Sequence, residues 1–139
     1  MRTAVIFATK TGHSRKLAVA IGKELTIEPQ EFRQLAKFQP VDLLFLVGGI
    51  YAGKSLPEFL GFIQSLQPEM VRKVVLVTSS MGKRTRQDAI RRLLLEKGIE
   101  VSKDEFTCQG SFLFFGMGHP DASEIEAAAA FAREQSAQS

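Results

Sequence analysis

The stretch that decides the fold is Ala4-Val5-Ile6-Phe7-Ala8-Thr9-Lys10-Thr11-Gly12-His13-Ser14, an apolar run that ends in hydroxyl residues and a glycine. The apolar part has the length of a buried strand, and the residues that follow have the spacing of an amphipathic helix. A strand that turns directly into a helix aims backbone N–H groups and the positive end of the helix dipole at one point. The turn between them therefore predicts a cradle for an anion such as a phosphate.

The side chains of this turn suit the same purpose. The hydroxyls of Thr9, Thr11 and Ser14 can donate to phosphate oxygens, and Gly12 lacks the Cβ that would hinder a close backbone approach. An ordinary helix cap is the alternative interpretation, in which Thr11 or Ser14 satisfies free N–H groups of the helix. The local sequence leaves both interpretations open.

Length and composition indicate one domain over residues 1–139. A chain of 139 residues with 45% hydrophobic and 24% charged residues is large enough for a buried core and too apolar for a disordered protein. It contains no internal repeat and no linker-like segment. We therefore expect a single compact domain.

Cysteine and histidine are too scarce for several kinds of site. Cys108 is the only cysteine and His13 and His119 are the only histidines, which excludes an internal disulfide and a CxxC pair and leaves no thiolate or His-rich metal site. We expect a cytoplasmic protein. The sequence predicts no signal peptide, and no run approaches the roughly 20 apolar residues of a membrane span.

Apolar runs alternate with amphipathic stretches from end to end. The runs at 43–47 and 74–77 are continuously apolar, as in parallel strands that helices cover on both faces. Alternation of this kind predicts an α/β three-layer sandwich with a five-stranded parallel sheet. Strands are expected at 3–8, 31–35, 43–48, 73–79 and 106–112, and helices at 13–25, 57–66, 85–97 and 122–135.

The loops after the strands are the place to look for a ligand, because open parallel sheets bind ligands outside the carboxyl ends of their strands. Besides 9–14, these loops comprise 48–55 after the third strand, 79–83 after the fourth and 110–120 after the fifth. Most are rich in small residues, which let a flat ligand lie against the backbone.

The segment Thr9–Ser14 fits the pattern Thr/Ser-x-Thr-Gly-x-Thr/Ser directly after the first strand and, with the strand and helix order of essentially the whole chain, resembles the flavodoxin family. The resemblance implies strand order 2-1-3-4-5, for which flavodoxin is the type example, with FMN bound where the winding switches between strands 1 and 3. It also implies an FMN-binding electron-transfer protein.

Residue by residue, the resemblance assigns the FMN phosphate to the first loop and the isoalloxazine ring to the second and third. Tyr51 is the candidate stacking residue, whereas Met81 stands where many members have an aromatic residue, and Lys10 places a cation in the phosphate loop. Backbone groups near Gly82 and between Gly49 and Ala52 are implied to meet the ring edge and N5. The implied cofactor-binding residues are Thr9, Lys10, Thr11, Gly12, His13, Ser14, Gly49, Ile50, Tyr51, Ala52, Gly53, Ser79, Ser80, Met81 and Gly82.

Charge indicates the kind of partner. The net charge is +3 and the pI about 9.2, whereas many electron-carrying flavodoxins are acidic, so the resemblance implies a redox partner with an acidic docking surface. The basic segment 83–97 has no interleaved aromatic residues, which argues against nucleic acid and suits a solvated helix face. The sequence leaves the oligomeric state open.

Other functions stay open beside electron transfer. Some relatives are flavin-dependent oxidoreductases of a small substrate such as a quinone or porphyrinogen, although the sequence offers no nucleophile–base pair and no paired carboxylates as catalytic residues. A flavodoxin-like domain that binds no cofactor and serves a partner is a further alternative.

Two classes of phosphate chemistry fit less well. Gly48-x-x-x-x-Gly53-Lys54-Ser55 matches the phosphate loop of nucleotide triphosphatases, but the next strand ends in Thr78-Ser79-Ser80 without the acid that orients magnesium. A receiver domain needs an acidic pair after the first strand and an Asp after the third, where this chain has Ala8-Thr9 and Gly48-Gly49.

Overall fold

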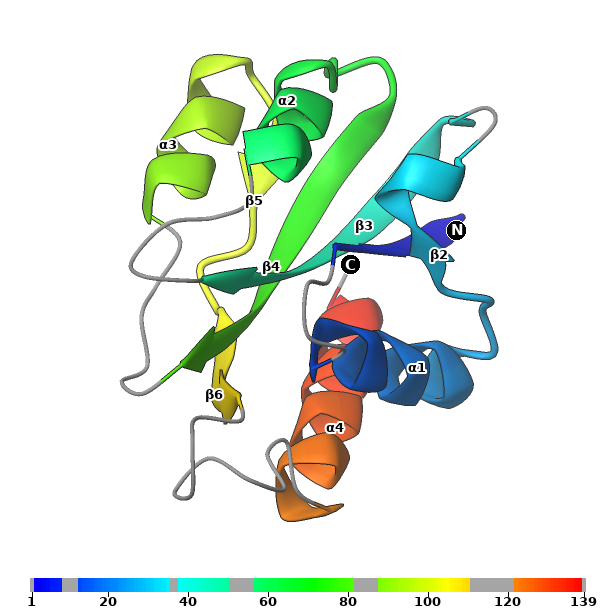
Figure 1. Ribbon diagram of the computed structural model, residues 1–139. Helices are drawn as coiled ribbons and strands as arrows, with labels where there is room; N and C mark the ends of the chain where they lie inside the picture. The colour runs from blue at the N-terminus through cyan, green and yellow to red at the C-terminus, as the bar shows by residue number, and fades with distance from the viewer. Residues whose placement is uncertain are drawn as a thin grey trace.

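The computed structural model describes residues 2–8, 13–35, 38–50, 57–81, 88–110 and 122–138. Within these residues a parallel sheet lies between two layers of helices, with α1 and α4 on one face and α2 and α3 on the other (Figure 1). The strands are β1 (Thr3–Phe7), β2 (Gln30–Glu31), β3 (Val41–Ile50), β4 (Val71–Met81), β5 (Glu100–Val101) and β6 (Phe106–Gly110). The helices are α1 (His13–Leu25), the 3-10 turn η1 (Phe32–Gln34), α2 (Pro57–Gln64), α3 (Asp88–Glu96) and α4 (Ala122–Gln138).

The sheet has the expected strand order. Its path is β2-β1-β3-β4-β5, all neighbours are parallel, and β6 also pairs with β4. The three-layer α/β sandwich and the order 2-1-3-4-5 are thereby confirmed. The continuous apolar runs form β3 and β4, whose pairing extends from Val41 opposite Val71 to Ile50 opposite Ser80.

Two cores explain why these runs are apolar at every position. Alternate residues of the central strands face opposite helix layers: Leu44 and Leu76 pack with Phe59 of α2, whereas Phe45 packs with Leu17 of α1. All five side chains are buried. A strand buried on both faces cannot alternate apolar and polar residues, which is why the sequence predicted these strands well.

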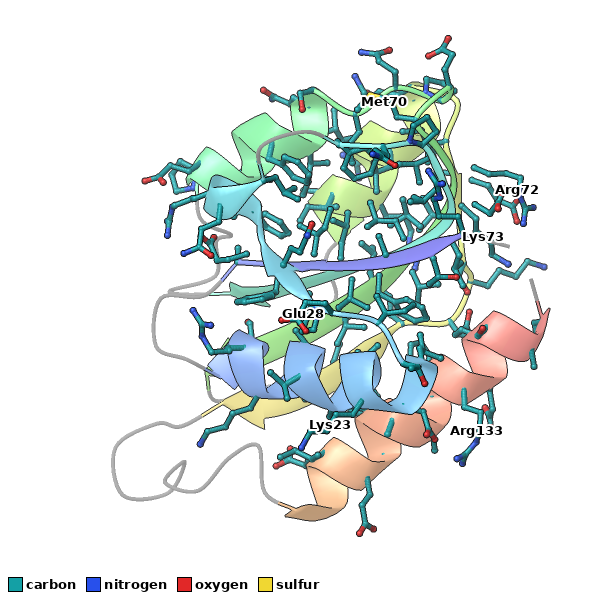
Figure 2. The ribbon with its side chains drawn as sticks, turned by 90° about the vertical axis from the view of Figure 1, so that its right-hand side faces the viewer. Lys23, Glu28, Met70, Arg72, Lys73 and Arg133 are labelled. Carbon is teal, nitrogen blue, oxygen red and sulfur yellow. The ribbon has the colours of Figure 1, made fainter. Side chains whose placement is uncertain are left out.

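The helix layer formed by α1 and α4 also contains an ion pair at its surface. Figure 2 shows Arg133 on α4 near the end of α1, and its guanidinium forms an ion pair with Glu24 of α1.

Beyond the end of α3, Gly98 has φ +85°, the left-handed conformation expected of a residue that stops a helix. Of the helices that the structure describes, none combines the length and apolar character needed to cross a membrane.

The expected strand at 31–35 is wrong over most of its length. Only Gln30 and Glu31 pair with β1, and η1 follows at once. The Glu31 carboxylate accepts a hydrogen bond from the Arg33 backbone N–H at 3.3 Å, which favours a turn, and the Phe32 ring lies 5.3 Å from that of Phe59. Capping and aromatic packing therefore end this strand early.

The fifth strand is split in a way that the sequence did not predict. Val74 of β4 pairs with Val101 of β5, and Val77 of β4 pairs with Phe106 of β6. Between these two pairings β4 advances by three residues and the outer strand by five. The two extra residues form a bulge. The expected strand at 106–112 is described as far as Gly110, and the expected helix at 85–97 from Asp88 to Glu96; residues 85–87, 111 and 112 lie outside the described ranges.

Candidate functional site

The candidate site lies at the edge of the sheet where β1, β3 and β4 end. Phe7 pairs with Val47 and Ile50 with Ser80, so the last residues of these strands are neighbours. From β1 the chain enters α1 on one face of the sheet, and from β3 it enters α2 on the opposite face (Figure 1). The winding therefore switches between β1 and β3, which is where open α/β sheets form a ligand-binding crevice.

The described structure covers the predicted site residues unevenly. Outside the described ranges are Thr9, Lys10, Thr11, Gly12, Tyr51, Ala52, Gly53 and Gly82, as is His119. The backbone alone is described for His13, Gly49, Ile50, Ser79, Ser80 and Met81. Ser14 is the one whose side chain is described as well.

The backbone brings the second and third candidate groups together. Gly49 and Ile50 at the end of β3 pair directly with Ser79 and Ser80 of β4, and paired strands run about 4.8 Å apart. Beside them, the Ala8 N–H donates to the carbonyl of Val47 at 2.9 Å, which holds the exit of β1 against β3. The described ends of the three segments predicted to hold one ligand thus lie at one edge of the sheet.

Ser14 is the most informative side chain of this edge. It is the second residue of α1, its side chain is fully buried at 0% exposure, and its Oγ has no hydrogen-bond partner. A buried hydroxyl without a partner costs about 1–3 kcal/mol. Its Oγ accepts no bond from a helix N–H, so helix capping does not account for it. A ligand oxygen at the start of α1 would satisfy it.

The charge around the start of α1 favours an anion. The first turn contains no acidic residue, while Arg15 and Lys16 follow Ser14 and are exposed. The Arg15 Cζ lies 5.0 Å from the centroid of the Phe7 ring, a cation–π contact that holds the guanidinium beside the end of β1. Positive side chains thus add to the positive end of the helix dipole.

Sequence reasoning did not single out Arg15. The available signal was an aromatic residue at the end of the first strand, followed by an arginine in the first turn of the helix. On its own that pattern also fits a solvated basic residue, and only the fold shows that Arg15 and Phe7 touch.

On the face of the sheet that α2 covers, an ion pair over an aromatic cluster joins η1 to α2. The Arg33 Nε lies 2.7 Å from the Glu58 Oε2 in the first turn of α2, and this hydrogen bond raises the pKa of the Arg33 guanidinium above its ordinary value. Beneath it the Phe32 ring lies 5.8 Å from that of Phe62. This arrangement fixes η1 against α2. Within the described ranges no three His, Cys, Asp or Glu side chains group as metal ligands would.

Comparisons with known proteins agree with this geometry. The family model described as flavodoxin domain matches residues 4–118. The comparison with curated proteins found no match. Among solved structures, a flavodoxin from the domain Archaea superposes with a TM-score of 0.77 at 12% identity, covering 95% of this chain and 94% of that one.

Two further flavodoxins superpose over almost their full length. A short-chain flavodoxin associated with a non-canonical PDU bacterial microcompartment has a TM-score of 0.70 at 22% identity, covering 96% of this chain and 95% of that one. Flavodoxin 2 from Bacillus cereus has a TM-score of 0.71 at 16% identity, and the match covers 100% of both chains. At these identities the structural likeness concerns the fold.

Proposed function

The chain belongs to the flavodoxin domain family, and from this premise we propose that it binds FMN and transfers electrons to and from partner proteins. When bound, FMN supplies an isoalloxazine ring that accepts and returns electrons, while the protein supplies its position and electrostatic surroundings. The observation that carries the proposal is the buried, unpartnered Ser14 Oγ at the start of α1.

The residues of the first loop would hold the FMN phosphate. In this proposal the hydroxyls of Thr9, Thr11 and Ser14 donate to phosphate oxygens, and the N-terminal dipole of α1 opposes the phosphate charge. Arg15 adds a cation at the same helix end. Each interaction favours a doubly charged phosphate over a neutral group, so riboflavin should bind far less well than FMN.

The ends of β3 and β4 would hold the ring. We place it between the loops that contain Gly49 to Gly53 and Ser79 to Gly82, with Tyr51 as its stacking partner. Support comes from the pairing of Gly49 and Ile50 with Ser79 and Ser80, which starts both loops from adjacent backbone positions.

Titration of the protein with FMN tests the proposal, followed by the visible flavin band and by loss of FMN fluorescence. Thr11→Ala and Ser14→Ala should each weaken binding about tenfold to a hundredfold, because each removes a hydrogen bond to a charged group. Ser65→Ala is the matched control, since the Ser65 hydroxyl donates to the Phe62 carbonyl at the end of α2. FMN binding that is absent, or equal in all four proteins, would overturn the proposal.

A second measurement separates an electron carrier from an enzyme. We expect the FMN-loaded protein to exchange electrons with a redox protein and to show no sustained turnover of a quinone or porphyrinogen. Steady turnover of either small molecule would favour the flavin-dependent oxidoreductase instead.

The partner should present an acidic surface. The net charge of +3 and the exposed Arg15 and Lys16 at the start of α1 support this, because opposite charges on the two surfaces speed encounter.

A further inference from the structure

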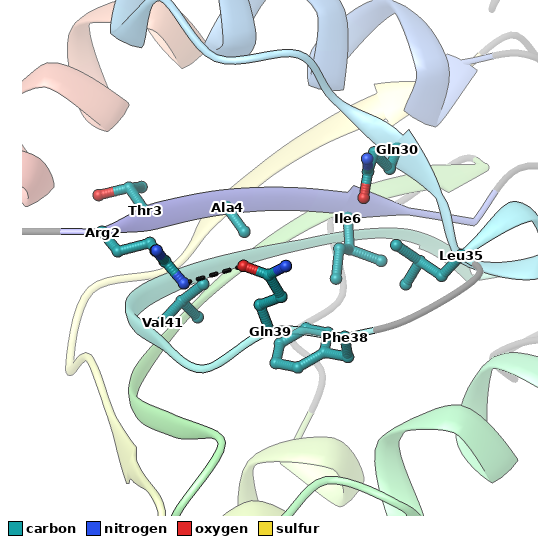
Figure 3. Close-up of a pocket in the computed structure, with 9 residues that line it drawn as sticks. All are labelled: Arg2, Thr3, Ala4, Ile6, Gln30, Leu35, Phe38, Gln39 and Val41. Atoms are coloured by element: carbon teal, nitrogen blue, oxygen red, sulfur yellow. Dashed lines mark hydrogen bonds between the residues drawn. The ribbon is translucent and has the colours of Figure 1, made fainter.

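A pocket lies away from the proposed FMN site, beside the first half of β1. Figure 3 shows it between β1, the start of β2, Leu35 and residues 38–41; its volume is about 270 Å³. Arg2 and Thr3 mark its position at the amino end of β1, whereas the proposed FMN site lies at the carboxyl ends of the strands. The two sites do not share a residue.

The floor of the pocket is apolar and incompletely covered. Five apolar side chains line it: Ala4, Ile6, Leu35, Phe38 and Val41. Ile6 belongs to the buried core, but the other four are only partly buried where they pack against that core. Covering them with an apolar ligand would remove more of their surface from water, which is favourable.

Among the described residues, the mouth of the pocket is polar and Arg2 carries its positive charge. The Arg2 Nη1 donates to the Gln39 Oε1 at 3.1 Å and to the Pro40 carbonyl at 3.4 Å, and both acceptors are neutral (Figure 3). None of the described residues that line the pocket is acidic. Asp42 lies nearby, and its carboxylate accepts the Arg2 backbone N–H at 2.8 Å.

The donors around Arg2 could complete a site for an anion. With its oxygen occupied by Arg2, the Gln39 amide still has N–H donors to offer, and the exposed Gln30 amide lines the opposite side. Among the described residues no ion pair involves the Arg2 guanidinium. A carboxylate at Arg2 would thus find one cation and the Gln39 amide, whereas Gln30, which pairs with Ile6, lies at the other end of the pocket (Figure 3).

We propose that this pocket binds a short aliphatic carboxylate, with its chain on the apolar floor and its carboxylate at Arg2. The volume is slightly below the range of about 300–1,000 Å³ that is typical for drug-sized ligands, which suits a small acid. We expect a dissociation constant of about 1 mM for so small a ligand. The proposal is independent of FMN binding.

Octanoate is the probe for the experiment, added to the full chain and followed by two-dimensional NMR of the backbone amides. Saturable shifts should centre on the residues that line the pocket. Octanol, which has the same chain without the charge, should bind at least about tenfold more weakly, and acetate, which has the charge without the chain, should not saturate.

Two variants locate the charge. Arg2→Gln should weaken octanoate binding about tenfold or more, because it removes the cation at the mouth. Arg72→Gln is the control: Arg72 is exposed at the start of β4 and outside the pocket, and should change the affinity less than about twofold (Figure 2). Thermal melts of both variants show whether they fold.

Three results would overturn the proposal. They are equal binding of octanoate and octanol, octanoate affinity unchanged by Arg2→Gln, and shifts centred elsewhere, such as on the exposed Leu95 of α3. The titration is repeated with FMN present to distinguish the two sites. Because the pocket is separate from the proposed FMN site, we expect the same octanoate response whether or not the protein binds FMN.

Discussion

At the scale of single residues, Ser14 links stability to ligand binding. Its Oγ is buried and has no hydrogen-bond partner within the protein, so replacing it should relieve an unfavourable contribution to stability. We expect Ser14→Ala to raise the free energy of unfolding of the ligand-free protein by about 1 kcal/mol, while it weakens FMN binding. Urea denaturation without and with FMN measures both effects.

The opposite signs make this prediction specific. If Ser14 merely supported the helix, replacing it would lower the free energy of unfolding of the protein and would leave its FMN affinity unchanged. Ser65→Ala removes a hydroxyl that has a partner, the Phe62 carbonyl, and should lower stability slightly without affecting FMN. A lower stability of Ser14→Ala in the ligand-free protein would contradict our interpretation of its hydroxyl.

Two helical glycines should respond oppositely to the same substitution. A Cβ on Gly22 would lie 2.5 Å from the Ile27 carbonyl oxygen and 2.8 Å from the Pro29 Cδ, whereas a Cβ on Gly61 would meet nothing within 4 Å. Alanine is otherwise the better helix former by about 0.5–1 kcal/mol. Gly61→Ala should therefore stabilise by that amount, and Gly22→Ala should destabilise by about 1–3 kcal/mol.

Thermal or urea denaturation of the two variants provides the comparison. Because each serves as the other's control, differences in helix propensity cancel. Equal stabilisation by both would mean that the segment after α1 can move away from Gly22 at little cost.

At the scale of elements, a partly buried ion pair joins α3 to the split outer strand. The Arg91 Nη2 of α3 lies 2.7 Å from the Glu105 Oε2, and its Nη1 donates to the Ser102 carbonyl at 2.8 Å, so α3 is joined to the bulge between β5 and β6. On the other side the Ser102 hydroxyl donates to the Gln135 amide oxygen of α4 at 2.6 Å. The bulge is thus held from both helix layers.

Breaking this pair should cost far more than breaking an exposed one of the same length. The side chains of Arg91 and Glu105 are 18% and 3% exposed, against 44% and 66% for Arg33 and Glu58, which are also 2.7 Å apart. We expect Arg91→Met to lower the free energy of unfolding by up to about 3–5 kcal/mol, and Arg33→Met to change it far less, because an exposed ion pair contributes little to stability.

Amide hydrogen exchange adds a local measurement to the denaturation curves. Arg91→Met should speed exchange in β6, whereas Arg33→Met should leave β6 unchanged. If both variants lose equally little stability and β6 stays protected, the ion pair does not hold the outer strand.

Elements were predictable from the sequence where burial alone decides their structure. The runs that form β3 and β4 are apolar because both faces are covered, and α1 begins and ends where its spacing predicted. The early end of β2 and the bulge depend also on contacts between residues far apart in the sequence, such as Phe32 with Phe59 and Glu105 with Arg91. No local pattern reports such pairs.

The same distinction applies to the candidate site. The hydroxyl pattern pointed to Ser14, because residue type and position after a strand are local features. The burial of its hydroxyl without a partner and the contact of Arg15 with Phe7 both arise when α1 packs on the sheet. Neither feature can be predicted from the local sequence.

At the scale of the whole molecule, the positive charge around the proposed FMN site should influence the rates of electron transfer. Charges steer encounters over a Debye length of about 10 Å at 0.1 M salt. The chain's net charge of +3 falls to about +1 when a doubly charged FMN phosphate is bound, so the exposed Arg15 and Lys16 at the helix end beside the phosphate carry most of the expected effect. An acidic partner should therefore react faster than a basic one at low ionic strength.

Two small oxidants of opposite charge test this without knowledge of the partner. The reduced, FMN-loaded protein should react with anionic hexacyanoferrate(III) at a rate that falls several-fold as salt rises from about 10 mM to about 300 mM, because screening weakens the attraction. With cationic hexaamminecobalt(III) the rate should rise over the same range.

Arg15→Gln combined with Lys16→Gln should flatten both salt dependences if the electrons leave near this helix end. Stopped-flow absorbance at the flavin band gives the rates, and a hexacyanoferrate(III) rate that rises with salt would mean that the surface around the flavin is acidic despite the net charge.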